Sequence, residues 1–516
     1  MPKETSVETS GLGALNWAVI IVYLLAMLGV GVYFTRRASR STDSYFRAQG
    51  RIPAWAAGFS IYATTLSAIT YMSTPEQAYL ADWSYAAGNL AIFAIVPILI
   101  WFYIPFFRKL NVVTAYDYLE ERFSPLVRVI GSLLFVLFHI GRIAVVVYLP
   151  TLAISSVTDI NPVLVAGVVG ILSVIYTFLG GIEGVIWADV IQGIILLLGA
   201  VLIIVVGLFF IDGGLGTVLS DAAADDKFIS TKNWHLTDVV NASIPLVFIG
   251  SVFTNLYQYT GSQDVVQRYQ TTASNSETAR SLLTNGVLAL VTIPLFYGMG
   301  TMLYSYFKHT SPLPESVNTS AVVPYFVVHV LPAGVSGLVL AAIFAAAQST
   351  LSSSMNSISA CLTVDIWDRF AVPRGGKQAS VGLARAIIIV AGLIGTGAAL
   401  YLTSTNQAET WNLFLSILGL FGTPLATVFA LGIFTRRANA VGVVTGLVVG
   451  SIGAWMVQSD GSSPFWVACV AFVLSAVVGY LASLLWSLVS RSDGHDITAL
   501  TIFGTKQEYV RRAERV

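Results

Sequence analysis

Residues 129–156 read VIGSLLFVLFHIGRIAVVVYLPTLAISS, an apolar run that contains one permanent charge, Arg142. A hydrocarbon core about 30 Å thick needs about 20 consecutive apolar residues in a helix, so this run predicts a membrane-spanning helix. A guanidinium at the centre of such a helix costs about 2.5–3.5 kcal/mol unless an anion or a water-filled cavity receives it. Because guanidinium binds a planar carboxylate through two parallel hydrogen bonds, Arg142 indicates either an anionic small-molecule substrate or a structural ion pair with another intramembrane acid.

The composition of the whole chain agrees with a membrane protein. Of the 516 residues, 56% are hydrophobic and 10% are charged, and the mean hydropathy is +0.77. Soluble domains usually carry about 25% charged residues. The formal net charge is zero, so nothing favours a nucleic-acid partner. The two cysteines, Cys361 and Cys469, lie in apolar runs, which indicates helix packing and not a disulfide or a metal site.

Hydropathy predicts an all-α protein with about thirteen spans of bilayer length. The predicted spans lie near 14–35, 53–80, 84–106, 129–156, 160–180, 187–211, 240–262, 282–306, 321–362, 382–404, 411–435, 438–458 and 464–489. The ninth is too long for one crossing, so a short interfacial helix is expected at its start. Arg36 and Arg37, and no small-residue cleavage site, follow the first span, which predicts a retained helix and not a signal peptide.

The distribution of basic residues predicts the orientation. With the N-terminus outside, 22 of the 27 Lys and Arg residues fall in inside-facing stretches, near 36–51, 108–128, 268–280, 369–385, 436–437 and 491–515. Arg268 is counted among them, and four basic residues fall outside. Cytoplasmic loops of membrane proteins carry this excess. The N-terminus is therefore expected outside and the C-terminus in the cytoplasm of a multi-pass protein in a bacterial inner membrane.

Little sequence lies outside the predicted membrane. The longest non-cytoplasmic connection, near 212–239, is long enough for a lid and too short for a domain. The sequence contains no Walker motif, GxGxxG, HExxH or Cys/His cluster, so ATP hydrolysis, redox chemistry and zinc chemistry have no support. We expect a transporter and not an enzyme.

The second span carries an unusual density of hydroxyl groups. Residues 63–70 read ATTLSAIT, with four hydroxyls in eight residues. Hydroxyls compete for nearby backbone groups and loosen a helix. A helix that is broken at mid-membrane offers free carbonyls to a cation and free N–H groups to an anion. The pattern favours a discontinuous transport helix, with packing by small residues as the alternative.

The ninth span adds a second polar cluster. Its run at 345–354 reads AAAQSTLSSS, and Ser349, Ser352 and Ser353 share one helical face. Neutral oxygen ligands suit a weakly held monovalent cation, whereas calcium and magnesium usually need carboxylates, so sodium fits best. Asp189, at the start of the sixth span, either adds a charge to such a site or is a helix-start acid stabilised by the helix dipole.

These motifs resemble the sodium:solute symporter family, and within it the bacterial sodium/sialic acid symporters. The resemblance extends over nearly the whole chain. Its matching stretches are 63–70, 106–110, 139–142, 180–192, 262–268 and 345–354. It implies the inverted-repeat fold of the bacterial leucine transporter with discontinuous helices.

The implied organisation is a single transmembrane domain over 1–516. An extra helix at 14–35 precedes repeat one (about 53–211) and repeat two (about 240–435). Two C-terminal helices near 438–489 and a cytoplasmic tail at 491–516 follow.

The resemblance also implies ligands for Na⁺ and substrate. The common sodium site would use backbone oxygens of Ala63, Leu66 and Ala346 with the hydroxyls of Ser349 and Thr350. An additional sodium site would use Asp189, Ser349, Ser352 and Ser353. The substrate carboxylate would meet Arg142, Ser67 and Thr70, and the rest of the substrate would contact Thr65, Ala68, Tyr85 and Asn89. Ala68 and Asn89 depart from the expected serine and glutamine.

We therefore expect a sodium-coupled symporter that imports an acidic sugar, most simply N-acetylneuraminate, by alternating access and as a functional monomer. Transport of another monosaccharide, polyol or organic acid is the alternative, and a sodium-dependent sensor without net transport is the alternative of another class. Three smaller features complete the expectations. Gly442, Gly446 and Gly450 predict helix packing, His139 a packing histidine, and the group Asn255, Tyr257 and Gln258 pocket or gate residues.

Overall fold

The structure is a computed structural model that describes residues 12–110, 114–155, 157–235, 243–372, 378–405, 418–489 and 500–503. Helices and loops make up these residues, with no strand among them. The all-α prediction is therefore confirmed.

The first half of the chain supplies eleven of the labelled α-helices. They are α1 (Ala14–Ala38), α2 (Thr42–Arg47), α3 (Ala54–Thr65), α4 (Ala68–Leu80), α5 (Ala86–Ile98), α6 (Ile104–Leu110), α7 (Ala115–Arg122), α8 (Pro125–Ser155), α9 (Pro162–Phe209), α10 (Leu215–Ala224) and α11 (Ile244–Leu256). A π-helical turn, η2 (Leu99–Tyr103), joins α5 to α6.

The second half continues in the same way. Its helices are α12 (Gln263–Gln270), α13 (Asn275–Thr292), α14 (Gly298–His309), α15 (Val322–His329), α16 (Val335–Cys361), α17 (Arg369–Ala371), α18 (Val381–Thr405), α20 (Thr423–Phe434), α21 (Ala440–Ser459) and α22 (Pro464–Val489). The π-helical turns are η4 (Tyr257–Gly261), η5 (Ile293–Tyr297), η7 (Leu362–Asp368) and η9 (Leu418–Gly422).

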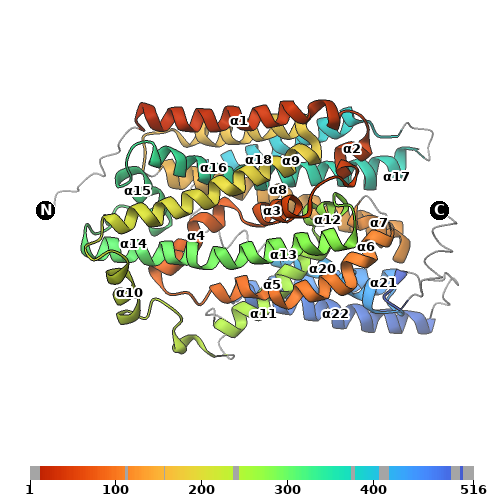
Figure 1. Cartoon of the computed structure of the whole chain (residues 1–516). Helices are drawn as coiled ribbons and strands as arrows, with labels where there is room; N and C mark the ends of the chain where they lie inside the picture. Colours follow the sequence, from red (N-terminus) through yellow and green to blue (C-terminus); the bar gives the residue numbers. More distant parts are fainter. Residues whose placement is uncertain are drawn as a thin grey trace.

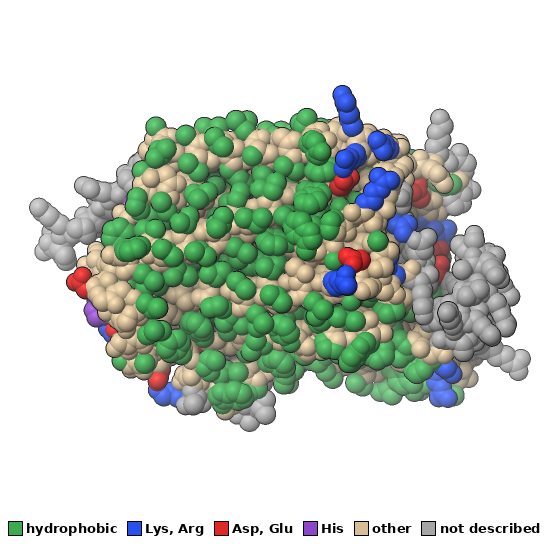
Figure 2. Space-filling view, viewed as in Figure 1, with side chains coloured by type: hydrophobic (Ala, Val, Ile, Leu, Met, Phe, Trp, Pro, Cys, Tyr) green, Lys and Arg blue, Asp and Glu red, His purple; other side chains and the backbone are tan. Residues whose placement is uncertain are grey.

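The long helices run roughly side by side, with α1 along one edge and α22 near the opposite edge (Figure 1). Among the described residues, nine helical stretches are long and apolar enough to cross a membrane. Apolar side chains cover the visible flank between the two ends of the bundle (Figure 2). A flank of this kind is what a bilayer requires of a spanning protein.

Helix α9 is two spans joined at one glycine. A straight helix of its 48 residues would extend about 72 Å at 1.5 Å per residue, more than twice the hydrocarbon thickness. Gly181 has φ 56° and ψ −165°, a conformation that L side chains rarely adopt. The break falls between the predicted spans 160–180 and 187–211, as the hydropathy indicated.

The predicted break in the second span is present. Leu66 and Ser67 have extended backbone conformations between α3 and α4, and Thr65 turns its hydroxyl back to the carbonyl of Tyr62 at 2.9 Å. A second break lies at Ser262, where the backbone is again extended between η4 and α12. Within the described residues, extended backbone thus interrupts the helical path between α3 and α4 and again between η4 and α12, and these two interrupted segments are the discontinuous helices.

The predicted ninth span divides as expected. The short helix α15 is separate from α16, and most residues of α16 are buried. Ala and Ser are the most frequent residues of this helix, so neighbouring backbones can approach it closely. Helix α16 is consequently the centre of the bundle.

The glycine stripe and the cysteines serve packing. A Cβ on Gly446 would lie 2.4 Å from the carbonyl oxygen of Ser475 on α22, and one on Gly442 would lie 2.5 Å from that of Gly479. The predicted intramolecular packing of this stripe is confirmed. Cys361 and Cys469 are buried free thiols, in agreement with their predicted packing role.

Candidate functional site

Arg142 bridges the two discontinuous helices. Its Nη1 lies 3.0 Å from Oδ2 of Asp264, at the start of α12, and its Nη2 donates to the carbonyl of Thr64, near the end of α3, at 2.8 Å. Only 3% of the Arg142 surface is exposed. The third donor, Nε, is buried and has no hydrogen-bond partner in the described part of the chain. The intramembrane acid foreseen as an alternative for Arg142 is thus Asp264.

A polar cavity of about 160 Å³ lies between α3, α4, α5, η4 and α13. Three of the predicted substrate residues line it, namely Thr65, Thr70 and Asn89. Asn255, a predicted pocket residue, also lines it, and so does Tyr259. The structure therefore brings three of the seven predicted substrate contacts to one cavity with several amide and hydroxyl groups.

The other predicted substrate residues lie beside this cavity and not on its wall. Ser67 precedes the first turn of α4, and Ala68 begins that helix with no exposed surface. The ring of Tyr85 packs on Phe465 of α22 at 5.6 Å between centroids. Arg142 reaches the cavity wall indirectly, because it binds the carbonyl that precedes Thr65.

Four of the five predicted ligands of the common sodium site meet between α3 and α16. The Ser349 hydroxyl donates to the carbonyl of Ala63 at 3.0 Å and contacts that of Ala346 at 3.2 Å. The Thr350 hydroxyl lies 3.4 Å from the same Ala346 carbonyl. Carbonyl and hydroxyl oxygens of this kind suit a hard monovalent cation. The fifth predicted ligand, Leu66, is the extended residue that ends α3.

The predicted ligands of the additional sodium site hold a guanidinium group. Nη2 of Arg268 lies 2.8 Å from Oδ2 of Asp189 and 2.6 Å from the hydroxyl oxygen of Ser353. The other two predicted ligands lie on the same stretch of α16, where the Ser352 hydroxyl donates to the carbonyl of Ser349 at 3.1 Å. Oδ1 of Asp189 is buried and accepts no hydrogen bond from any described residue.

His139 connects the two polar centres. Its ring nitrogens lie 2.9 Å from the Ser354 hydroxyl on α16 and 3.3 Å from the Ser262 hydroxyl at the break before α12. The residue is fully buried. Both nitrogens have partners, which fits the packing role predicted for this histidine.

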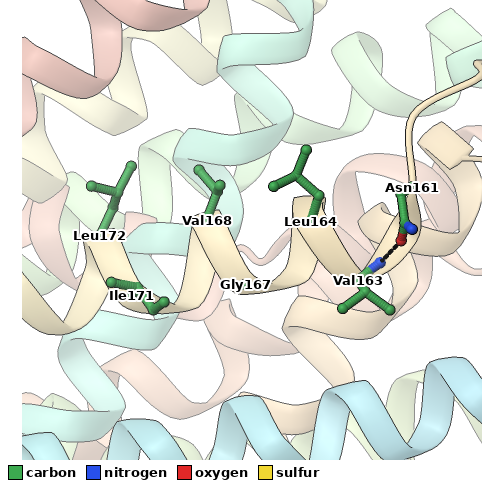
Figure 3. A pocket seen from close by; sticks show the side chains of 7 residues that line it. All are labelled: Asn161, Val163, Leu164, Gly167, Val168, Ile171 and Leu172. Atoms are coloured by element: carbon green, nitrogen blue, oxygen red, sulfur yellow. Dashed lines mark hydrogen bonds between the residues drawn. The ribbon is translucent and has the colours of Figure 1, made fainter.

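A larger hollow, about 630 Å³, lies on the bilayer-facing surface at the start of α9. Its labelled side chains are apolar except for Asn161, whose carboxamide caps the helix by accepting from the amide of Val163 at 2.8 Å (Figure 3). Leu164 and Ile171, which line the hollow, are more than half exposed. A surface of this kind faces lipid and offers no groups for an ionic substrate.

Sequence reasoning missed Asp264 and Arg268 as members of the site. It counted Arg268 in an inside-facing stretch, but the side chain is fully buried. The sequence did contain a local signal for them. Asp264 and Arg268 lie four residues apart, and this spacing places opposite charges on one helical face. Of the other suggested gate residues, Gln258 lies 3.4 Å from the Asp264 carboxylate, and Tyr257 is buried against Phe138.

Comparisons with known proteins agree with this architecture. A sequence model of the sodium:solute symporter family matches residues 45–450. The sodium/sialic acid symporter NanT of Aliivibrio fischeri is 44% identical over 513 residues, which are 98% of this chain and all of the relative. The sodium/sialic acid symporter SiaT of Proteus mirabilis is 44% identical over 90% of this chain and 94% of its own.

A solved structure leads to the same result. The substrate-bound outward-open state of a Na⁺-coupled sialic acid symporter superposes with a TM-score of 0.86 at 42% identity, covering 92% of this chain and 98% of that chain. The fold is therefore the leucine-transporter type that the family resemblance implied.

The chain belongs to the sodium:solute symporter family. It is a multi-pass inner-membrane protein and a sodium-coupled transporter, not an enzyme.

Proposed function

We propose that this protein imports an acidic sugar, most simply N-acetylneuraminate, together with sodium by alternating access. The observation that carries the proposal is the position of Arg142. Its buried guanidinium contacts both discontinuous helices, at Thr64 and at Asp264. Substrate bound to Arg142 would therefore act on both of these helices, and discontinuous helices form the binding sites of such transporters. The names of the two relatives at 44% identity supply the substrate class.

The sodium sites follow the predicted ligand sets. We assign the common site to Ala63, Leu66, Ala346, Ser349 and Thr350, and the additional site to Asp189, Ser349, Ser352 and Ser353. Two facts support the assignment. Ala63, Ala346 and Ser349 lie within hydrogen-bonding distance, and one buried carboxylate oxygen of Asp189 accepts no hydrogen bond from the part of the chain that the structure describes.

The remaining parts of the proposal are orientation, organisation and assembly. We propose that the N-terminus lies outside and the C-terminus in the cytoplasm, because Lys and Arg side chains gather at the end where α22 finishes (Figure 2). Two repeats, near 53–211 and 240–435, would each contain one discontinuous helix. The single chain holds every proposed ligand, so a monomer suffices for transport.

Uptake into proteoliposomes tests the proposal. The purified chain should accumulate radiolabelled N-acetylneuraminate under an inward sodium gradient, and replacing sodium with choline should abolish accumulation. Two sodium ions and one monoanion carry one net positive charge inward. Each such charge is worth about 2.3 kcal/mol per 100 mV, so a negative interior should increase uptake.

Two further measurements, competition by a panel of sugars and uptake at different membrane voltages, could contradict the proposal. Neutral sugars of similar size should not compete with the acidic sugar, since they lack the carboxylate for Arg142. Competition by a neutral polyol would favour the alternative substrate class. Ala68 and Asn89, which stand where the resemblance leads us to expect serine and glutamine, are compatible with that alternative. Uptake that ignores voltage would count against a second coupled sodium ion.

A further inference from the structure

The eight-residue helix α12 carries two buried opposite charges whose side chains do not pair with one another. All eight of its residues are buried. The guanidinium of Arg268 donates to the backbone carbonyl of Asp264, while the Asp264 carboxylate binds Arg142 and the Arg268 guanidinium binds Asp189. Each charged side chain on α12 therefore pairs with a residue to which the proposed function assigns a transported species. Arg142 is assigned to the substrate carboxylate, and Asp189 is assigned to sodium.

The carboxylate of Asp264 takes the place proposed for the substrate carboxylate. Its Oδ2 lies 3.0 Å from Nη1 of Arg142, and its Oδ1 accepts from the Ser262 hydroxyl at 2.5 Å and from the Val265 amide at 2.9 Å. Both are buried, with side-chain exposures of 4% for Arg142 and 0% for Asp264. A second carboxylate could use the same guanidinium donor only by displacing Asp264, because like charges repel strongly at such depth.

The guanidinium of Arg268 takes the place proposed for a sodium ion. Its Nη2 contacts Asp189 and Ser353, and its Nε donates to the Ser60 hydroxyl at 2.6 Å. Ser60 itself donates to Oδ2 of Asp189 at 2.5 Å. A sodium ion ligated by the same carboxylate and hydroxyl would lie within a few ångströms of a buried cation, so ion and guanidinium exclude each other.

The two contacts lie on one short rigid element. Helix α12 begins after the extended residue Ser262 and ends at Gln270, and Asp264 and Arg268 are about one helical turn apart. A displacement of α12 would therefore break both ion pairs together, and the return of α12 would restore both.

We propose that α12 is a built-in substitute for the cargo: Asp264 replaces the substrate carboxylate at Arg142, and Arg268 replaces sodium at Asp189 and Ser353. This inference rests on the proposed function. Its consequence concerns coupling, because an unloaded carrier must return across the membrane with the charges of Arg142 and Asp189 compensated. Buried charges without partners are strongly unfavourable, and α12 supplies the partners.

The test compares net uptake with exchange in proteoliposomes for Arg268→Gln and Asp264→Asn. Net uptake requires the unloaded carrier to return, whereas exchange of internal for external substrate at saturating sodium does not. We expect both variants to lose roughly tenfold or more of net uptake while exchange is retained, since the return step loses its compensating charges. Arg280→Gln and Asp226→Asn, which alter exposed charges, are the matched controls.

A binding measurement gives the inference its second readout. Removing a competitor should tighten binding, so Arg268→Gln should lower the sodium concentration that half-maximally raises the melting temperature without substrate. Asp264→Asn should bind the acidic sugar more tightly at saturating sodium. If the ion pairs of α12 are purely structural and are never displaced by cargo, binding should instead be weaker or unchanged in each variant.

The outcomes separate the inference from the function on which it rests. An unmodified protein that shows no sodium-dependent uptake of any acidic sugar overturns the proposed function. Normal uptake by that protein, with net uptake and exchange falling equally in both variants, overturns the substitute role of α12. Should Arg268→Gln fail to fold, the exchange and binding results for Asp264→Asn decide alone.

Discussion

The phenol of Tyr23 on α1 donates a hydrogen bond of 2.6 Å to the side-chain oxygen of Gln348 on α16. Gln348 directly precedes Ser349, a proposed ligand of both sodium sites. The backbone oxygen of Gln348 accepts from the Tyr176 hydroxyl at 2.7 Å, so two helices hold this point of α16. The family match begins at residue 45, which places α1 before the matched region.

Removing the Tyr23 hydroxyl should therefore weaken sodium binding without removing a ligand. In Tyr23→Phe the buried side-chain oxygen of Gln348 loses the hydroxyl that donates to it, and an unsatisfied buried polar group costs about 1–3 kcal/mol. We expect a several-fold rise in the sodium concentration for half-maximal uptake. Tyr33→Phe, on the exposed face of the same helix, is the control, and equal sodium curves for the two variants would leave α1 without a role at the site.

Direct loss of sodium ligands should also raise the sodium requirement. Ser349→Ala and Thr350→Ala each remove one oxygen near the Ala346 carbonyl and barely change the helix volume. A lost ligand worth about 1 kcal/mol corresponds to roughly a fivefold higher half-maximal sodium concentration. Sodium titration of uptake is the measurement.

Ser487→Ala is the matched control for these two variants. Its hydroxyl also bonds to the carbonyl three residues earlier, at 2.7 Å from Leu484, but it is exposed. A loss of folded protein in Ser349→Ala with an unchanged sodium curve in the remaining protein would assign the hydroxyls to packing alone.

Close contact between α21 and α22 predicts a stability effect. An alanine Cβ at Gly446 would meet the Ser475 carbonyl at 2.4 Å, and overpacking of this kind costs about 1–3 kcal/mol. Gly446→Ala should lower the apparent melting temperature in detergent. Gly167→Ala, where a Cβ meets nothing within 4 Å, should not, and an equal loss in both variants would contradict the packing interpretation.

Patterns that depend on neighbouring residues were readable in the sequence. The hydroxyls at 64, 65, 67 and 70 predicted the break that the structure has at Leu66 and Ser67. The length of 321–362 predicted a separate short helix, now α15. Breaks and helix limits follow from local backbone competition and from hydropathy, which act over a few residues.

Pairs between distant helices were not readable in the same way. Arg142 and Asp264 are 122 residues apart, and Asp189 and Arg268 are 79 apart. The sequence indicated that Arg142 needs an anion, but the choice between a substrate and an internal acid depends on how the two discontinuous helices meet. The ligand sets themselves came from the family resemblance and remain predictions.

A cluster on α10 and α14 predicts a dependence on pH. Asp221 contacts the side chains of Ser305, Lys308 and His309. Burial raises the pKa of Asp221, whereas the hydrogen bonds from these three residues lower it, and the result is a pKa of about 2. In an unfolded chain the pKa of Asp is about 3.9.

Because the folded pKa is the lower one, Asp221 stabilises the protein above about pH 4, and this contribution is lost as the pH falls toward 2. The melting temperature of the unmodified protein should exceed that of Asp221→Asn at pH 6, and the difference should shrink at pH 3. Asp226→Asn, which alters an exposed ion pair, should show no such trend. A difference that is constant from pH 6 to pH 3 would exclude titration of Asp221 as its cause.

Arg142→Lys tests the substrate carboxylate itself. Lysine keeps the positive charge beside Asp264 but cannot reproduce the planar fork of guanidinium. The loss of one charge-assisted hydrogen bond, about 1.5–3 kcal/mol, corresponds to roughly 10- to 150-fold weaker substrate binding. Sodium binding without substrate should persist, because no proposed sodium ligand is altered. Calorimetric titration with N-acetylneuraminate at saturating sodium measures the effect, and Arg280→Lys, at an exposed position, controls for the exchange of side chains. Equal substrate affinity in Arg142→Lys and the unmodified protein would restrict Arg142 to its ion pair with Asp264.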